Sequence, residues 1–105
     1  MTTKTVYINP GQSFEIYTHG NILFPTHYPE AIIKNNSLAP IRAVNYWAAP
    51  IGDYNQYTYI EVYPGETKTL TAPINAIYFY RIVIINLSDS ITAEIEVTSQ
   101  IWNWG

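Results

Sequence analysis

The feature of this sequence that most restricts its fold is the frequency of turn-forming residues. They divide the chain into short segments whose apolar residues lack the spacing of a helix. No window of about 11 residues places apolar side chains at the i, i+3, i+4 and i+7 positions of an amphipathic helix without a proline or glycine nearby. The runs between the turns are rich in β-branched and aromatic residues, which favour β-strands. The sequence therefore predicts about eight strands, at residues 6–8, 13–18, 31–34, 41–48, 57–63, 67–72, 76–86 and 91–101.

The two halves of the sequence repeat one pattern, with residues 6–16 aligned on residues 60–70 at an offset of about 54. In each half a strand ends in Pro-Gly, at Pro10-Gly11 and at Pro64-Gly65, and a strand that begins with Ser or Thr follows. Pro-Gly suits the two central positions of a type II turn. The sequence predicts a hairpin at each of these turns, and a third hairpin connection at residues 86–90.

Each half continues through an Asn-x-Ser motif, at residues 35–37 and 86–88, and contains four predicted strands. Four strands twice indicate two Greek keys packed as a sandwich. We expect an all-β, eight-stranded antiparallel jelly roll that forms one domain over residues 1–105. The repeat indicates either two-fold pseudosymmetry or the chance recurrence of Pro-Gly turns. Each Asn-x-Ser motif matches the N-glycosylation pattern, but turn-forming Asn and Ser explain it equally well.

Two of the predicted strands differ in their burial patterns. Apolar and polar residues alternate over residues 91–101, which predicts one core face and one solvent face. Residues 77–85 are apolar on both faces apart from Arg81, which indicates a central strand covered on both sides or a face kept for a partner. We expect Arg81 to lie at an edge of the buried region or to pair with Glu94 or Glu96 on the next strand.

Charge is scarce, and this narrows the classes of function. Only 12% of residues are charged, against about 25% in ordinary globular domains, and the net charge is −3. A phosphate-binding surface for nucleic acid is therefore not expected. A surface rich in Tyr, Trp and Asn resembles protein interfaces and sugar-binding faces, although a merely lightly charged domain is the alternative. We expect no membrane span. The sequence leaves the localisation open, with an extracellular surface or a virion favoured over the cytoplasm.

Catalytic and metal-binding patterns are missing from the sequence. There is no cysteine, no Gly-x-Ser-x-Gly motif and no glycine-rich phosphate loop. His19 and His27 are the two histidines, and their spacing does not match zinc-binding motifs. Glu94 and Glu96 alternate onto one strand face, where a solubilising role is more common than a glycosidase pair. We therefore expect no enzyme activity, no metal and no cofactor.

Aromatic residues are the candidate contact surface. Alternation places Tyr57, Tyr59 and Tyr63 together on the outward side of one strand. Such a ladder suits contact with a neighbouring subunit, stacking on sugar rings, or cross-strand packing on an exposed face. The residues that we predict to contact a subunit or ligand are Tyr46, Trp47, Tyr54, Tyr57, Tyr59, Tyr63, Trp102 and Trp104.

The general pattern resembles small jelly-roll subunits of phage particles and bacterial extracellular appendages. The resemblance lies in Ile-x-Val-x-Pro-Gly-x-Thr at residues 60–67 and Ile-Ile-Asn-x-Ser at residues 84–88, and it implies a structural subunit that assembles with copies of itself. The lack of cysteine counts against spore appendages, whose subunits would be expected to cross-link.

Two other functions remain open from the sequence alone. The main rival is a carbohydrate-binding module, with either the terminal tryptophans or Trp47, Tyr54 and Tyr57 stacking on sugar rings beside polar residues 53, 55 and 56. A small toxin or inhibitor that binds another protein is the third possibility.

Overall fold

The structure is a computed structural model that describes residues 2–19, 30–48, 52–72 and 79–99. The described residues form eight strands and no helix. The strand that departs most from its predicted bounds is β1, which begins at Thr2 rather than at Val6. The strands are β1 (Thr2–Ile8), β2 (Ser13–His19), β3 (Ala31–Asn35), β4 (Ile41–Ala48), β5 (Asn55–Val62), β6 (Thr67–Leu70), β7 (Phe79–Asn86) and β8 (Ala93–Ser99).

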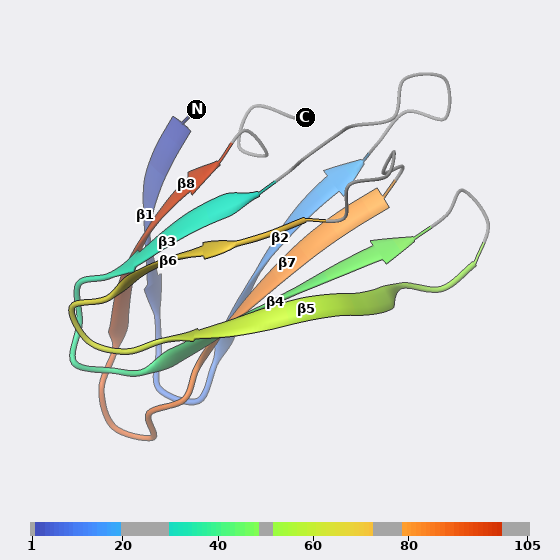
Figure 1. Cartoon of the computed structure of the whole chain (residues 1–105). Helices are drawn as coiled ribbons and strands as arrows, with labels where there is room; N and C mark the ends of the chain where they lie inside the picture. Colours follow the sequence, from blue (N-terminus) through green and yellow to red (C-terminus); the bar gives the residue numbers. More distant parts are fainter. Residues whose placement is uncertain (1, 20–29, 49–51, 73–78, 100–105) are drawn as a thin grey trace.

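The strands form two four-stranded sheets that pack face to face (Figure 1). Sheet A has the order β1-β8-β3-β6, sheet B has the order β2-β7-β4-β5, and every pairing is antiparallel. Except between β4 and β5, successive strands alternate between the two sheets. This order is that of a jelly roll, so the predicted fold class is confirmed.

The predicted hairpins are wrong, although the predicted turns are present. Gly11 and Gly65 have φ values of 71° and 81°, and the amides of Gln12 and Glu66 donate to the carbonyls three residues before them, as in type II turns. Each of these turns nevertheless joins a strand of sheet A to a strand of sheet B. The link at residues 86–90 also crosses between the sheets. A local turn signal shows where the chain reverses, but it does not show which sheet the next strand joins.

The core lies between the sheets and is supplied by alternate residues of each strand. On β8, Ala93, Ile95, Val97 and Ser99 are buried, while the residues between them are half-buried on the outer side. The alternation predicted for this strand is confirmed over these positions, and Ile91 precedes the strand and is exposed. The remaining large members of the core come from both sheets and include Ile33, Ile41, Val62, Leu70, Tyr80, Ile82 and Ile84.

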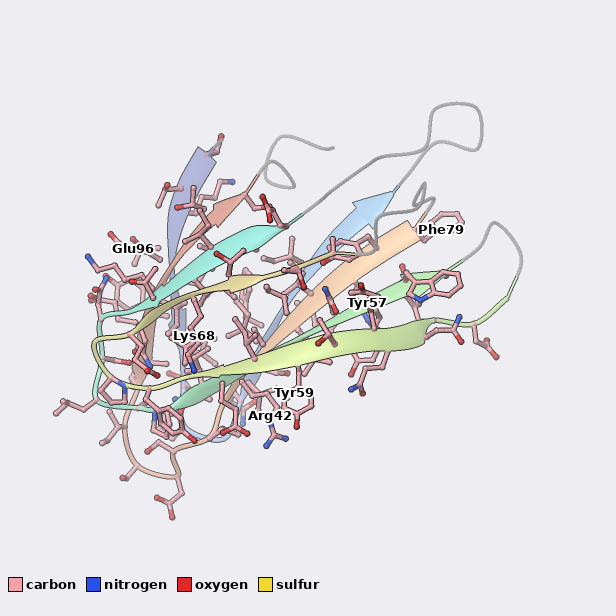
Figure 2. All side chains as sticks on the ribbon, in the orientation of Figure 1. Arg42, Tyr57, Tyr59, Lys68, Phe79 and Glu96 are labelled. Carbon is pink, nitrogen blue, oxygen red and sulfur yellow. The ribbon has the colours of Figure 1, made fainter. Side chains whose placement is uncertain are left out.

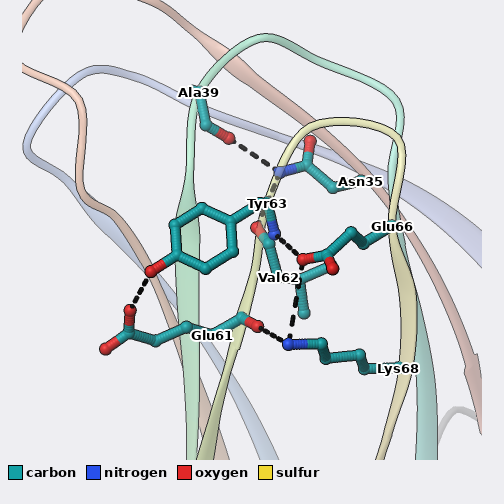
Figure 3. Close-up of polar contacts among 7 residues, drawn as sticks. All are labelled: Asn35, Ala39, Glu61, Val62, Tyr63, Glu66 and Lys68. Atoms are coloured by element: carbon teal, nitrogen blue, oxygen red, sulfur yellow. Dashed lines mark hydrogen bonds and ion pairs between the residues drawn. The ribbon is translucent and has the colours of Figure 1, made fainter.

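Two buried asparagines, Asn35 and Asn86, fix the crossovers between the sheets. The side-chain Nδ2 of Asn35 donates to the carbonyls of Ala39 and Val62, at 2.7 and 2.9 Å (Figure 3). Its Oδ1 accepts from the amide of Ser37 at 2.9 Å. The end of β3 is therefore tied through Asn35 to the turn that follows it and to the end of β5, where the chain crosses to β6.

Asn86 repeats this arrangement in the other half of the chain. Its Nδ2 donates to the carbonyls of Ile91 and Ile8, and its Oδ1 accepts from the amide of Ser88. Ile8 is the residue that the sequence repeat aligns with Val62. The contacts of the two halves are thus equivalent, and the offset reflects two-fold pseudosymmetry. Because both Nδ2 groups are buried donors, the Asn-x-Ser motifs act as turns here.

A third buried asparagine, Asn45, creates a β-bulge between β4 and β5. Asn45 lies opposite Thr58 and Tyr46 lies opposite Gln56, so Tyr57 has no residue opposite it. The amide of Thr58 donates to the Oδ1 of Asn45 at 2.9 Å. The Nδ2 of Asn45 donates to the carbonyl of Thr71 and to the hydroxyl of buried Tyr80, each at 2.8 Å.

We predict that Asn86→Asp lowers the free energy of unfolding by about 3 kcal/mol, because two buried carbonyls lose their donor and face a carboxylate instead. Urea denaturation at pH 7 measures this loss. Asn36→Asp adds the same charge at an exposed position of the other Asn-x-Ser motif and should change the stability by less than about 0.5 kcal/mol. Equal stabilities of the two variants would contradict the role of Asn86.

Tyr80 should make the stability depend on pH in alkaline solution. Burial raises the pKa of Tyr80 from 10.0 to about 12, so the unfolded chain loses this proton first. Its contribution to stability is complete below pH 10 and falls by about 1.4 kcal/mol per pH unit as the pH rises from 10 to 12.

Tyr80→Phe lacks this contribution and should cost about 1 kcal/mol at pH 7, where the hydrogen bond from Asn45 is lost. We expect the stability gap between the wild type and Tyr80→Phe to close or reverse in urea denaturation near pH 11. A gap that stays constant between the two pH values would show that the hydroxyl is not protected by burial.

Candidate functional site

The two sheets present outer faces of different chemistry. On sheet A the outward residues alternate with the buried ones and are mostly threonine, glutamate and lysine. Thr3 and Thr98 join their hydroxyls across β1 and β8 at 2.7 Å, and Lys34 lies 3.8 Å from Glu96. The outer face of sheet A comprises Thr3, Thr5, Tyr7, Ile32, Lys34, Thr67, Thr69, Glu94, Glu96 and Thr98.

The outer face of sheet B carries aliphatic, aromatic and arginine side chains. On β7 the outward residues are half-buried, and no other described strand lies over them (Figure 1). The described positions of the apolar run at residues 77–85 therefore do not fit the reading of a strand covered on both sides. The outer face of sheet B comprises Ser13, Glu15, Arg42, Val44, Tyr46, Tyr59, Glu61, Arg81, Val83 and Ile85.

Arg42 organises one end of this face. Its guanidinium carbon lies 5.4 Å from the centre of the Tyr59 ring, and its Nη2 donates to the Oε1 of Glu61 at 3.0 Å. The other carboxylate oxygen of Glu61 accepts from the hydroxyl of Tyr63 at 2.8 Å. The hydrogen bond from Tyr63 and the one from Arg42 hold the pKa of Glu61 below its ordinary value, and the same carboxylate raises the pKa of Tyr63. The rings of Tyr59 and Tyr63 are thus fixed in place while remaining exposed.

Arg81 organises the other end of the face. Its guanidinium carbon lies 4.7 Å from the ring centres of both Tyr46 and Tyr54. The predicted pairing of Arg81 with Glu94 or Glu96 is wrong, because those residues lie on β8 in the other sheet. Arg81 instead faces Tyr46 across β4 and β7. The prediction failed because the link at residues 86–90 carries the chain to the other sheet instead of forming a hairpin.

The β-bulge separates Tyr57 from the other tyrosines of β5. Figure 2 shows Tyr59 and Arg42 on one side of the sheet, and Tyr57 on the side that faces β6. Tyr57 also influences the pKa of buried Tyr80, which points into the sandwich. The predicted outward ladder is therefore correct for Tyr59 and Tyr63 and wrong for Tyr57, since the extra residue changes the alternation.

The predicted contact residues divide into two groups. Tyr46, Tyr54, Tyr59 and Tyr63 gather around the two arginines on the outer side of sheet B. Trp47 and Tyr57 lie near the end of the sandwich opposite to that of Asn35 and Asn86, with 38% and 47% of their surfaces exposed. Trp102 and Trp104 lie outside the described residues.

Arg42, Arg81, Val83 and Ile85 are absent from the predicted contact residues, although a face kept for a partner was one interpretation of the run at residues 77–85. Arg81 gave the one signal that could have indicated it, because a single charge in an apolar strand marks a face that is neither solvent nor core. Arg42 gave no such signal, because its role depends on Tyr59 and Glu61 from the neighbouring strand.

The described residues form neither a metal site nor a membrane-spanning helix. No group of three His, Cys, Asp or Glu side chains there is placed to hold a metal ion. His27 lies outside the described residues. The described part of the chain also has no helix of the length and apolar character needed to cross a membrane.

Comparison with solved structures places the fold among known jelly rolls. The crystal structure of PirA has a TM-score of 0.80, with 22% identity over 93% of this chain and 93% of that chain. The Yersinia pseudotuberculosis-derived mitogen has a TM-score of 0.60, with 15% identity over 92% of this chain and 83% of that chain. A de novo designed double-stranded β-helix has a TM-score of 0.55, with 18% identity over 95% of this chain and 100% of that chain. At these identities the likeness establishes the fold alone.

Comparison at the level of sequence gives the family. No curated protein sequence matches the chain. The resemblance to phage and appendage subunits is supported only at the level of the jelly-roll fold. A family model described as PirA-like matches residues 2–96, which include β1 to β7 and part of β8. The chain therefore belongs to the PirA-like family.

Proposed function

We propose that this protein is a binding module without catalytic activity, and that it recognises another protein through the outer face of sheet B. The observation that carries this proposal is the contrast between the two outer faces. Both belong to sheets of four strands and both carry two glutamates, yet the sheet A face is mostly Thr, Glu and Lys, whereas the sheet B face combines two tyrosines and two arginines with Val and Ile.

The residues of the sheet B face are those that protein interfaces favour. Interface cores are enriched in Tyr and Arg and depleted in Lys and Glu, and the residues that dominate binding energy are most often Trp, Tyr and Arg. Here Tyr59 and Tyr46 are each held against an arginine, so they lose little freedom when a partner covers them. Aliphatic Val83 and Ile85 lie beside them and supply apolar area.

The self-assembling subunit that the sequence suggested is one form of this proposal, in which the partner is a second copy of the chain. In the other form, the protein that binds to the outer face of sheet B is a different protein. The small share of charged residues suits both forms. Burying aromatic and aliphatic side chains of the sheet B face against a partner would remove them from water. The identity of the molecule bound at Tyr59 separates the two forms.

Two exposed tyrosines on opposite sheets provide a matched test. Tyr59 is 53% exposed on sheet B and Tyr7 is 67% exposed on sheet A. A photo-crosslinking residue at position 59 should capture a defined protein in extracts of the producing organism, whereas the same residue at position 7 should not. With the captured protein purified, Tyr59→Ala should weaken binding about thirtyfold in Kd by calorimetry, and Tyr7→Ala should leave it unchanged.

The same experiment identifies failure clearly. Equal crosslinking from positions 59 and 7, or equal loss of affinity in the two alanine variants, would contradict recognition through sheet B. Capture of this chain alone at position 59, with a mass above 12.0 kDa by light scattering, would establish the self-assembling form.

A glycan site at the end of the sandwich is the second candidate. Trp47 and Tyr57 leave about half of their rings exposed near the end where β4 terminates, beside polar Asn55, which lies opposite Trp47. Exposed aromatic rings beside amide side chains can stack on sugars and hydrogen-bond their hydroxyls.

This second candidate predicts binding to a polysaccharide or glycan array that Trp47→Ala abolishes. Tyr59→Ala is the matched control, since Tyr59 lies on the other side of the bulge and should not affect sugar binding. Absence of binding to every glycan tested, or equal loss in both variants, would rule out a sugar site at this end.

A further inference from the structure

Arg81 lies between two aromatic rings on the outer face of sheet B. Its guanidinium carbon is 4.7 Å from the centre of the Tyr46 ring and 4.7 Å from that of the Tyr54 ring. Tyr46 is the residue opposite Arg81 on β4, and Tyr54 comes from the segment before β5. Contacts of this kind stabilise a cation through the electron-rich faces of the rings, and they fix the guanidinium in position.

Within the described residues, no carboxylate accounts for the charge of Arg81. The ion pairs there join Lys34 to Glu96, Arg42 to Glu61 and Lys68 to Glu66. The Nε of Arg81 is buried and has no hydrogen-bond acceptor in the described part of the protein, as is also true of the Nε of Arg42, so the carboxylate is what distinguishes the two. Glu15 is the acidic residue of the same face on the neighbouring strand, but it lies opposite Val83 rather than Arg81.

Arg42 provides an internal comparison. It stacks on one ring, Tyr59, and its guanidinium also binds the carboxylate of Glu61 at 3.0 Å. Among the described residues, Arg42 is therefore paired with a ring and a carboxylate, whereas Arg81 is placed between two rings without a carboxylate. The two arginines differ in what a partner can add to them.

We propose that Arg81 is the charged anchor of the sheet B interface and that it receives a side-chain carboxylate, Asp or Glu, of the partner protein. This inference rests on the proposed function. The rings contact the guanidinium plane, so a ligand must approach along its edge, where a planar carboxylate accepts two parallel N–H hydrogen bonds. Val83, the next outward residue on β7, would cover one side of that ion pair with apolar area and help to exclude water from it.

A test that needs no partner uses the two arginines of the chain, Arg42 and Arg81. Protein labelled with ¹⁵N-arginine should give two Nε–H signals by NMR, and Arg42→Lys assigns them. Titration with N-acetylglutamic acid α-amide, at constant ionic strength, should shift the Arg81 signal saturably, with a dissociation constant in the millimolar range. N-acetylglutamine amide, the uncharged analogue, should not shift it, and the Arg42 signal should not respond to either compound.

Variants and further probes make the result specific. Tyr54→Leu removes one ring and should weaken the response about fivefold, while the backbone amide spectrum verifies that the fold is intact. Tyr7→Leu, on sheet A, is the matched control and should leave the titration unchanged. Inorganic sulfate and methyl glucuronide are the remaining probes, and both should bind Arg81 more weakly than the glutamate analogue does.

Several outcomes would overturn the inference. These are no shift at Arg81, equal shifts at both arginines, a stronger response to sulfate, or a stronger response to the glucuronide, which would indicate an acidic sugar instead. The crosslinking experiment at Tyr59 fails or succeeds independently. Partner binding without a carboxylate response would reject only the role of Arg81, and a carboxylate response without partner binding would reject only the protein interface.

Discussion

The fold depends on polar side chains buried at the points where the chain crosses from one sheet to the other. In a jelly roll most neighbours in sequence are not neighbours in a sheet, so the strand ladders do not hold the crossovers together. Asn35 and Asn86 supply those bonds, and the buried side-chain amide of each donates to two carbonyls. Their equivalence across the two halves explains why the Asn-x-Ser motif recurs: the same crossover must be stabilised twice.

A third asparagine links the core to the surface. Asn45 holds the amide of Thr58, and the extra residue that this creates on β5 turns Tyr57 away from Tyr59. One buried amide thus decides which aromatic rings share the outer face of sheet B and which lie near the end of the sandwich. The bulge between β4 and β5 therefore separates the outer face of sheet B from the candidate surface at Trp47 and Tyr57.

Local patterns in the sequence predicted what depends on local physics. Alternation identified the strands and the core face of β8, and Pro-Gly located the turns. The same patterns failed for strand pairing, because a turn at Pro64-Gly65 has the same local geometry whether or not the next strand stays in the sheet. Alternation failed at Tyr57 because the bulge is caused by Asn45, which is distant in sequence. The prediction of the candidate site named its tyrosines but not its arginines. The rings that surround the arginines come from other parts of the chain, so no local pattern indicated them.

The contrast between the arginines and the outer glutamates follows from where each charge is placed. Glu94 and Glu96 lie on the sheet A face among threonines, where a charge is solvated and contributes to solubility. Arg42 and Arg81 lie among rings and aliphatic residues, where water solvates a charge less well and stacking must replace part of that solvation. A guanidinium tolerates such surroundings better than an ammonium, because it is more weakly hydrated and stacks on rings. The placement of Arg42 and Arg81 among rings and aliphatic residues, and of Lys34 among the threonines of sheet A, follows from this difference in solvation.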